Sequence, residues 1–154
     1  MAIYHLSVKI ISRSSGRSSV AAAAYRSGDT LTNEWDGLTH DYSKKHWIEH
    51  TEIILPPNAP EEFKDRSTLW NAVEMAEKSS NAQLAREVEL ALPIELSPQE
   101  RLSLVRSYIK ENFTSKGMCA DFAIHNPPLT DDRGRPIDLN GNPTNDISKM
   151  IFRN

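Results

Sequence analysis

The feature that most constrains this chain is the segment SRSSGRSSVAAAAYRSG at residues 12–28. It opens as a loop rich in serine, glycine and arginine, and it then becomes a run of alanines. Alanine is the best helix former and glycine commonly ends a helix, so we predict a helix over residues 18–27 that stops at Gly28. Tyr25 lies near the end of that helix and Arg26 follows it. The segment therefore holds a phenol on a short, stiff element behind a basic loop.

The sequence around Tyr25 is positively charged. Residues 1–27 contain no carboxylate but hold four cations, Lys9, Arg13, Arg17 and Arg26. A tyrosine oxygen attacks phosphorus and other electrophiles when a base or a metal ion assists it. A lone tyrosine on an alanine-rich helix is more often a residue that packs against the core. The segment by itself leaves both interpretations open.

Composition limits the class of protein. The 154 residues are 38% hydrophobic and 25% charged, which predicts one globular domain over residues 1–154. The sequence has neither an apolar run long enough to span a bilayer nor the layout of a signal peptide, so we expect no membrane insertion. Cys119 is the only cysteine, which excludes an intramolecular disulfide and a cysteine-based zinc cluster and is typical of the cytoplasm. The net charge of −3 argues against a protein that coats nucleic acid everywhere, but it permits a local basic groove.

Hydrophobic periodicity predicts strands and helices without a regular strand–helix–strand rhythm. We expect strands at residues 3–11, 47–55, 84–92 and 118–125. We expect further helices at residues 66–78 and from a capping box at residues 97–100 to about residue 113. Residues 28–45 are predicted to form a hairpin or an irregular flap, and residues 126–145 a Pro/Gly/Asp-rich loop before the segment 147–152. This pattern favours an α+β fold with an antiparallel sheet packed by helices.

Alternation along three predicted strands places ionisable side chains opposite an apolar face that we expect helices to cover. The ionisable faces carry His5, Lys9, Glu87, Glu89, Asp121 and His125. If these faces align, they form a floor of carboxylates and imidazoles beneath the Tyr25 helix. One face of an antiparallel sheet is commonly just exposed to water, so the glutamates alone do not decide between these interpretations.

A run of motifs in this order resembles the N-terminal relaxase domain of the MobA/MobL family, the MobQ class of HUH endonucleases. The motifs are YHLSVKIISRSSGRSSVAAAAYRSG, HDYSKK, EHTEIILPPNAP, LWNAVEMAEKSSNAQLAREVELALPIELS and ADFAIHNP. The resemblance covers nearly the whole chain. It implies an antiparallel sheet with the active site on one face. It also implies an enzyme that cuts one DNA strand at a plasmid transfer origin, keeps the 5′ end as a phosphotyrosine and later rejoins it.

The resemblance also implies roles for individual residues. Tyr25 falls where the family keeps its nucleophile, and His125 falls on the first histidine of a three-histidine metal cluster. Glu87 and Glu89 match the acidic motif near the metal, as ligand-orienting or proton-accepting groups. His5 lies in the shared N-terminal motif and, with Asp121, is a candidate for active-site support. We expect contacts with DNA from the four N-terminal cations, and base stacking or simple packing from three aromatic residues, Trp35, Tyr42 and Trp47.

One departure from the family pattern concerns the metal. The resemblance implies a divalent ion, Mg²⁺ or Mn²⁺, held partly by a His-hydrophobic-His pair, yet no histidine follows His125. We interpret the chain as a relaxase domain that is incomplete at its C-terminal end, with a naturally degenerate, non-cutting fragment as the alternative. A lone imidazole predicts poor metal affinity.

The competing hypotheses are a module that binds DNA or a partner protein without cutting, and a metal-dependent hydrolase that uses His125 and the glutamates. The resemblance implies as partners single-stranded or hairpin DNA at the transfer origin, relaxosome accessory proteins and a coupling protein, all in the bacterial cytoplasm.

Overall fold

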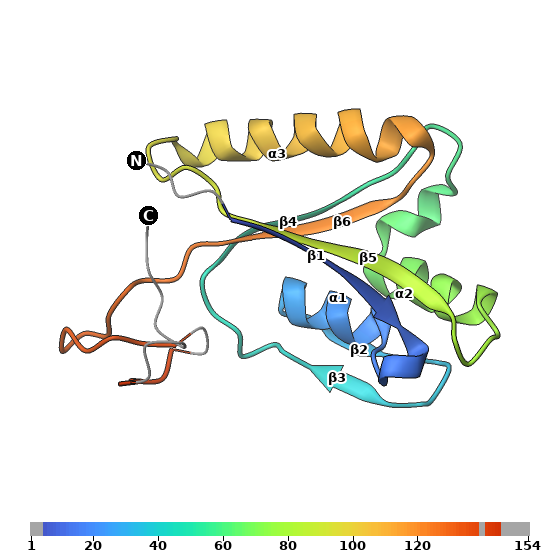
Figure 1. The fold of residues 1–154 in the computed structure, drawn as a ribbon, viewed down its shortest axis with the longest axis horizontal. Helices are drawn as coiled ribbons and strands as arrows, with labels where there is room; N and C mark the ends of the chain where they lie inside the picture. The colour runs from blue at the N-terminus through green and yellow to red at the C-terminus, as the bar shows by residue number, and fades with distance from the viewer. Residues whose placement is uncertain (1–4, 139–140, 146–154) are drawn as a thin grey trace.

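The strands of the protein pair as three antiparallel couples in the computed structural model, which describes residues 5–138 and 141–145. β1 (Leu6–Ser12) pairs with β5 (Gln83–Leu90), β2 (Thr30–Thr32) with β3 (Thr39–Asp41), and β4 (Ile48–Ile54) with β6 (Ala120–His125). The four longer strands cross the middle of the molecule, with helix α3 (Pro98–Asn112) on one side and helices α1 (Ser19–Ser27) and α2 (Arg66–Ala76) on the other (Figure 1). Short 3₁₀ turns lie at Arg13–Ser15, Glu61–Lys64 and Thr114–Lys116, labelled η1, η2 and η3.

Helix α1 matches the prediction for residues 18–27. The Ser18 side chain accepts a hydrogen bond from the backbone N–H of Ala21, and Gly28 ends the helix in the left-handed region at φ 72°. A Cβ at Gly28 would lie 2.5 Å from Cδ1 of Ile48, which that side chain can relieve by moving, so the left-handed conformation is the main reason for glycine here.

The two other helices begin at side-chain caps. The Asp65 carboxylate accepts from the backbone of Thr68 at the start of α2. Ser97 and Glu100 form the predicted capping box at the start of α3. No described helix is long and apolar enough to cross a membrane.

The second half of the alanine run in α1 is part of the core. Val20, Ala23 and Ala24 are buried together with Leu31, and the rings of Tyr42 and Trp70 pack against this cluster. Small side chains on the inward face let α1 lie close to its neighbours, because protein interiors are filled to crystal-like density. A second buried cluster joins Ile11 of β1 to Ala82 and Leu84.

One sequence-based expectation is wrong: the described helices do not cover the apolar face of β1 and β5. The side chains on that face, Leu6, Val8, Ile10 and Leu90, are 44%, 60%, 48% and 37% exposed. The physical reason is the position of α3, which is tied to β4 by the ion pairs Arg101–Glu49 and Arg106–Glu52. The segment 147–152 and the start of the first predicted strand at residues 3–4 lie outside the described residues.

Candidate active site

Tyr25 lies on the last turn of α1 with part of its ring packed and part exposed. Its ring meets the ring of Tyr42 edge to face, with the centroids 5.3 Å apart and the planes at 87°. The residue is nevertheless 42% exposed. The packing interpretation thus describes the ring, which meets Tyr42, while the side chain stays open to solvent and its role as a nucleophile stays a prediction.

Lys45 approaches the same tyrosine from the turn that follows β3. Its Nζ donates a hydrogen bond of 2.6 Å to the backbone oxygen of Tyr25 and lies 3.6 Å from the centroid of the Tyr25 ring. Desolvation, and then the charge of Arg26, lower the pKa of Lys45 to about 8. Sequence reasoning assigned no role to Lys45, because nothing local in HDYSKK shows that its side chain folds back onto α1.

His125, at the end of β6, binds the next carbonyl of α1. Its Nε2 lies 2.8 Å from the backbone oxygen of Arg26. A carbonyl only accepts, so Nε2 carries the proton and the neutral ring has its lone pair on Nδ1. Desolvation of the ring is the largest cause that lowers the pKa of His125, so the imidazole is neutral at pH 7. Lys45 and His125 thus bind two consecutive carbonyls that the helix end leaves without partners.

The guanidinium of Arg26 lies between the sheet carboxylates. Its Nη1 is 3.6 Å from Glu87 Oε2 and its Nη2 is 3.9 Å from Asp121 Oδ2. Arg17 also pairs with Glu87, at 3.2 Å. Burial lowers the pKa of Arg26, although its two carboxylates oppose that shift. Within the predicted floor of carboxylates and imidazoles, arginines therefore neutralise Glu87 and Asp121.

Asp121 is the most enclosed acid of this network. Its side chain is 2% exposed and accepts two bonds from Arg66, at 2.9 and 3.0 Å, and one from Trp70 Nε1 at 2.7 Å. Arg66 extends the network to Asp29 at 2.8 Å. Asp121 thus joins β6 to α2, and among the described residues its contact with the Tyr25 helix is the ion pair with Arg26.

His5, Lys9 and Glu89 lie on the exposed part of the β1–β5 couple. Lys9 is opposite Glu87 in the strand register, and His5 Nε2 is 3.9 Å from Glu89. Glu89 acts on the site through its charge, which favours the protonated form of His125.

Arg13 is bound to other parts of the protein. Its guanidinium donates to the backbone oxygens of Glu74 and Ser79, each at 2.9 Å, to that of Glu77, and to the Glu74 carboxylate at 3.0 Å. It also stacks on the Trp35 ring at 3.9 Å, and its side chain is only 14% exposed. Of the four N-terminal cations, Lys9 and Arg17 are the more accessible, and the contacts of all four with DNA stay predictions.

Sequence reasoning missed Glu74, which fixes the start of α1. The residue is 1% exposed, and besides Arg13 it accepts from the backbone N–H of Ser19 at 2.8 Å and from the hydroxyls of Ser18 and Ser19. A carboxylate at a helix N-terminus is also favoured by the helix dipole. The basic loop and the Tyr25 helix are therefore positioned by one acid from α2.

The three predicted stacking aromatics all have partners within the protein. Trp35 lies under Arg13 and Tyr42 packs on Tyr25. Trp47 has a positive φ of 64° and its ring abuts Gly141, where an added Cβ would lie 2.4 Å from Cη2 of Trp47. Packing thus accounts for these rings, and base stacking remains a prediction for them.

The donors in the described part of the chain do not fit a divalent ion. No group of three or more His, Cys, Asp or Glu side chains there is arranged to hold a metal. His125 donates from Nε2 to a carbonyl, which leaves the Nδ1 lone pair as a single imidazole donor beside the charges of Lys45 and Arg26. The described residues alone therefore give no complete site for the ion that the resemblance implies.

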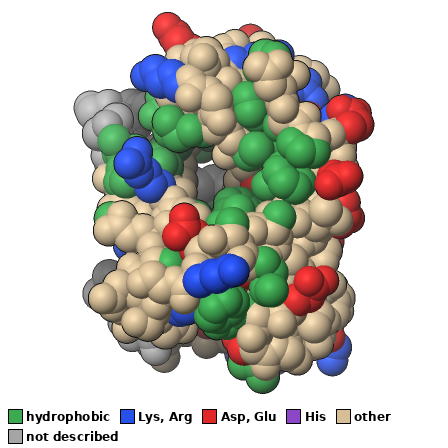
Figure 2. Space-filling view, turned by 90° about the vertical axis from the view of Figure 1, so that its right-hand side faces the viewer, with side chains coloured by type: hydrophobic (Ala, Val, Ile, Leu, Met, Phe, Trp, Pro, Cys, Tyr) green, Lys and Arg blue, Asp and Glu red, His purple; other side chains and the backbone are tan. Residues whose placement is uncertain are grey.

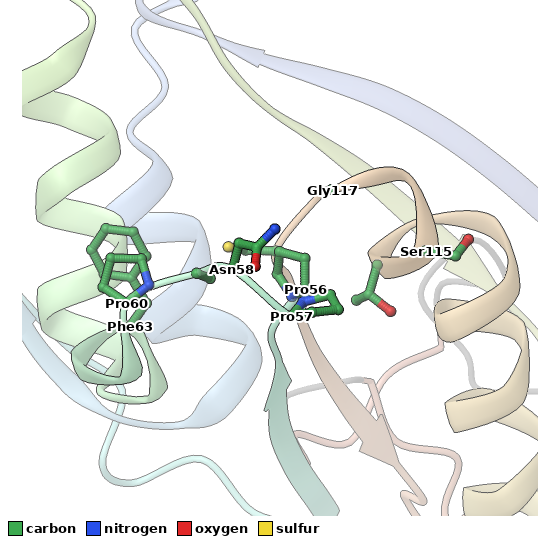
Figure 3. Close-up of a pocket in the computed structure, with 10 residues that line it drawn as sticks. Pro56, Pro57, Asn58, Pro60, Phe63, Ser115 and Gly117 are labelled. Carbon is green, nitrogen blue, oxygen red and sulfur yellow. The ribbon is translucent and has the colours of Figure 1, made fainter.

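A cavity of about 500 Å³ lies at the other end of the β4–β6 couple. Its walls come from Pro56, Pro57, Asn58, Pro60 and Phe63 on one side and from Ser115 and Gly117 on the other (Figure 3). Figure 2 shows the face that lies on the right-hand side of Figure 1, and apolar side chains border a hollow in it. The strand register places Ile54 opposite Ala120 near the cavity and Ile48 opposite His125 near the Tyr25 site. The cavity is thus separate from the candidate active site.

Comparison with known proteins identifies similar sequences. The profile of the MobA/MobL family matches residues 17–139. "Mobilization protein MobL" of Acidithiobacillus ferridurans is 46% identical over 133 residues, which are 86% of this chain and 34% of that protein. "Conjugal transfer protein TraA" of Rhizobium radiobacter is 42% identical over 138 residues, which are 83% of this chain and 12% of that protein. The chain thus spans only a minor part of these relatives' length.

A solved structure is also similar. It is described as "Molecular Basis of Vancomycin Resistance Transfer in Staphylococcus aureus", and it matches with a TM-score of 0.77 at 32% identity, over 86% of this chain and 74% of that chain. The predicted α+β fold with antiparallel strands is confirmed by this match and by the strand pairing.

Proposed function

Because the chain belongs to the MobA/MobL family of mobilisation proteins, we propose that it is the nucleophile-bearing part of a conjugative relaxase. The full protein would nick one strand of DNA at a transfer origin in the bacterial cytoplasm and keep the new 5′ end on Tyr25. The observation that carries the proposal is Tyr25 itself, a partly exposed phenol on a helix turn whose carbonyls are bound by Lys45 and His125.

The proposed reaction is a transesterification at phosphorus. Oη of Tyr25 attacks the scissile phosphorus, a bond from Oη to phosphorus forms, and the bond from phosphorus to the 3′ oxygen breaks. The phenol loses one proton and the leaving 3′ oxygen gains one, so the step needs no oxidant or reductant. Attack by a 3′ hydroxyl on the phosphotyrosine reverses these changes and rejoins the strand.

The two glutamates have different roles in this proposal. Glu87 orients the site, because its carboxylate holds Arg17 and Arg26 beside the Tyr25 helix. Glu89 is exposed and is not tied to an arginine in the described structure, so it is the better candidate to accept a proton. His5 and Asp121 support the site indirectly, through Glu89 and Arg26 respectively.

The divalent ion, Mg²⁺ or Mn²⁺, is proposed for a longer chain. A version extended by roughly ten residues, enough for one strand, and carrying two further histidines should bind Mn²⁺ in calorimetry. It should also form a covalent adduct with a labelled transfer-origin oligonucleotide. The 154-residue chain should do neither efficiently, because one imidazole does not hold a divalent ion in a defined geometry.

The control for that experiment is the extended chain with both added histidines replaced by alanine. It should fold like its parent and lose both the Mn²⁺ isotherm and the adduct. Equal metal-dependent cutting by the 154-residue chain would show that the proposed metal site is wrong.

We propose a local basic strip for DNA contact, formed by Lys9 and Arg17. Replacing both residues by alanine should weaken binding to a single-stranded oligonucleotide. It should also reduce the magnitude of the slope of log K against log [salt] by about 1.4, since each single-strand phosphate contact contributes about 0.7. Fluorescence anisotropy between low and moderate salt measures both quantities.

Lys110 and Lys116 provide the matched control for charge. Both are exposed and belong to α3 and η3, away from Tyr25, so their double alanine variant removes the same charge elsewhere. Its salt slope should stay at the wild-type value. The same loss of slope in both double variants would mean that net charge, and not the proposed strip, sets the affinity.

The second candidate is a module that binds transfer-origin DNA, or a relaxosome accessory or coupling protein, without cutting. The lack of a three-donor metal group among the described residues favours it for the present chain. The adduct separates the two functions, because a binding module leaves no DNA covalently attached.

A further inference from the structure

We propose that Lys45 is the cation that receives a backbone phosphate of the bound strand beside Tyr25; this inference rests on the proposed function. Its ammonium lies over the Tyr25 ring, 3.6 Å from the centroid, and is anchored by the 2.6 Å bond to the Tyr25 carbonyl. A lysine ammonium has three donors, and the carbonyl uses one of them. The other donors lie beside the phenol that is proposed to attack phosphorus.

The charge of Lys45 differs from the other charges around the helix. Arg17, Arg26 and Arg66 each have a carboxylate within 4.0 Å. Lys45 pairs with no carboxylate in the described part of the structure, although its side chain is half-buried. Its desolvated charge gains only partial compensation from one carbonyl and one ring.

The groups around Lys45 favour the binding of an anion to its ammonium. Arg26 is the other cation that acts on it, and the neighbouring imidazole of His125 is directed to the Arg26 carbonyl. A phosphodiester oxygen placed here would meet a charged donor that is already held in place. Charge-assisted bonds of this kind are among the stronger hydrogen bonds in proteins.

A purely structural role is the competing explanation. A cation at a helix C-terminus interacts favourably with the helix dipole, so Lys45 would stabilise α1 even without DNA. That role predicts a change in thermal stability when Lys45 is replaced, and no change in how the affinity for DNA depends on salt.

The test compares Lys45→Met with Lys44→Met in the 154-residue protein, with a short single-stranded oligonucleotide as the probe. Lys44 is the adjacent, exposed lysine. Lys45→Met should weaken binding about tenfold at low salt and reduce the magnitude of the salt slope by about 0.7. Lys45→Arg should restore the slope, and Lys44→Met should leave it unchanged. An unchanged slope in Lys45→Met with a lowered melting temperature would overturn the proposal.

A second measurement on the wild-type protein does not depend on the variants folding. Reductive methylation followed by mass spectrometry should show that the oligonucleotide protects Lys45 more than Lys44. Equal modification of Lys45 with and without DNA would overturn the proposal. A failure of the proposed function would give a different result. The oligonucleotide would still protect Lys45 from methylation, but the extended chain loaded with metal would form no covalent adduct.

Discussion

Replacing Tyr25 by phenylalanine in the extended chain should abolish covalent attachment to DNA while affinity for single-stranded DNA stays within about twofold. The substitution removes only Oη and keeps the ring that packs on Tyr42 and lies under Lys45. No hydrogen bond of this hydroxyl occurs within the described structure, so the variant leaves no partner unsatisfied there. The free energy of unfolding should therefore change by no more than about 0.5 kcal/mol.

The measurement is a denaturing gel of protein incubated with a labelled transfer-origin oligonucleotide. Tyr42→Phe is the matched control, because it removes the phenol oxygen from the neighbouring ring of the same aromatic pair. It should still form the adduct. A band of the covalent adduct that persists in Tyr25→Phe would show that Tyr25 is not the nucleophile.

Replacing Glu74 by alanine should lower the free energy of unfolding by about 3–5 kcal/mol, because it removes the one carboxylate that pairs with the largely buried Arg13 in the described structure. The Arg13 guanidinium would lose its carboxylate, and the start of α1 would lose the acceptor for Ser18 and Ser19. Denaturant unfolding monitored by circular dichroism measures this change.

Glu77→Ala is the control on the same segment. The Glu77 side chain is exposed, and its contact with Arg13 uses the backbone oxygen, which the substitution keeps. Its unfolding free energy should stay within about 0.5 kcal/mol of wild type. Similar losses in the two variants would mean that Glu74 does not have the special position that its contacts indicate.

The contribution of Glu74 to the free energy of unfolding should also depend on pH. Burial raises the pKa of its carboxyl, but hydrogen bonds from Arg13 and Ser19 outweigh burial and hold the pKa below its usual value. A lowered folded-state pKa contributes stability above the unfolded pKa of about 4.3, and this stability is lost as the pH falls through the folded value. The difference in unfolding free energy between wild type and Glu74→Ala should therefore be full at pH 7 and shrink below about pH 4. A difference that grows on acidification would contradict the ionised pair with Arg13.

Much of the fold was predictable from the sequence because the signals are local. The alanine run with Ser18 and Gly28 defines α1, and the Ser97–Glu100 capping box defines the start of α3. Period-two alternation predicts the four long strands, and the order of the motifs predicts the family. Each of these features depends on residues within one or two turns of each other, or on motif order along the chain, so no knowledge of packing is needed.

Only the tertiary structure decided which side chains meet. Arg13 and Glu74 are 61 positions apart, and Lys45 is 20 positions from the carbonyl that it binds. It likewise decided that the arginines neutralise Glu87 and Asp121 and that Val8 and Leu90 stay exposed. The physical reason is that distant groups meet only through the packing of whole elements, whereas helix caps and strand alternation are fixed by neighbours along the chain. The sequence by itself therefore determined the elements and the family, while the environment of Tyr25 depended on how α1, α2, β5 and β6 pack together.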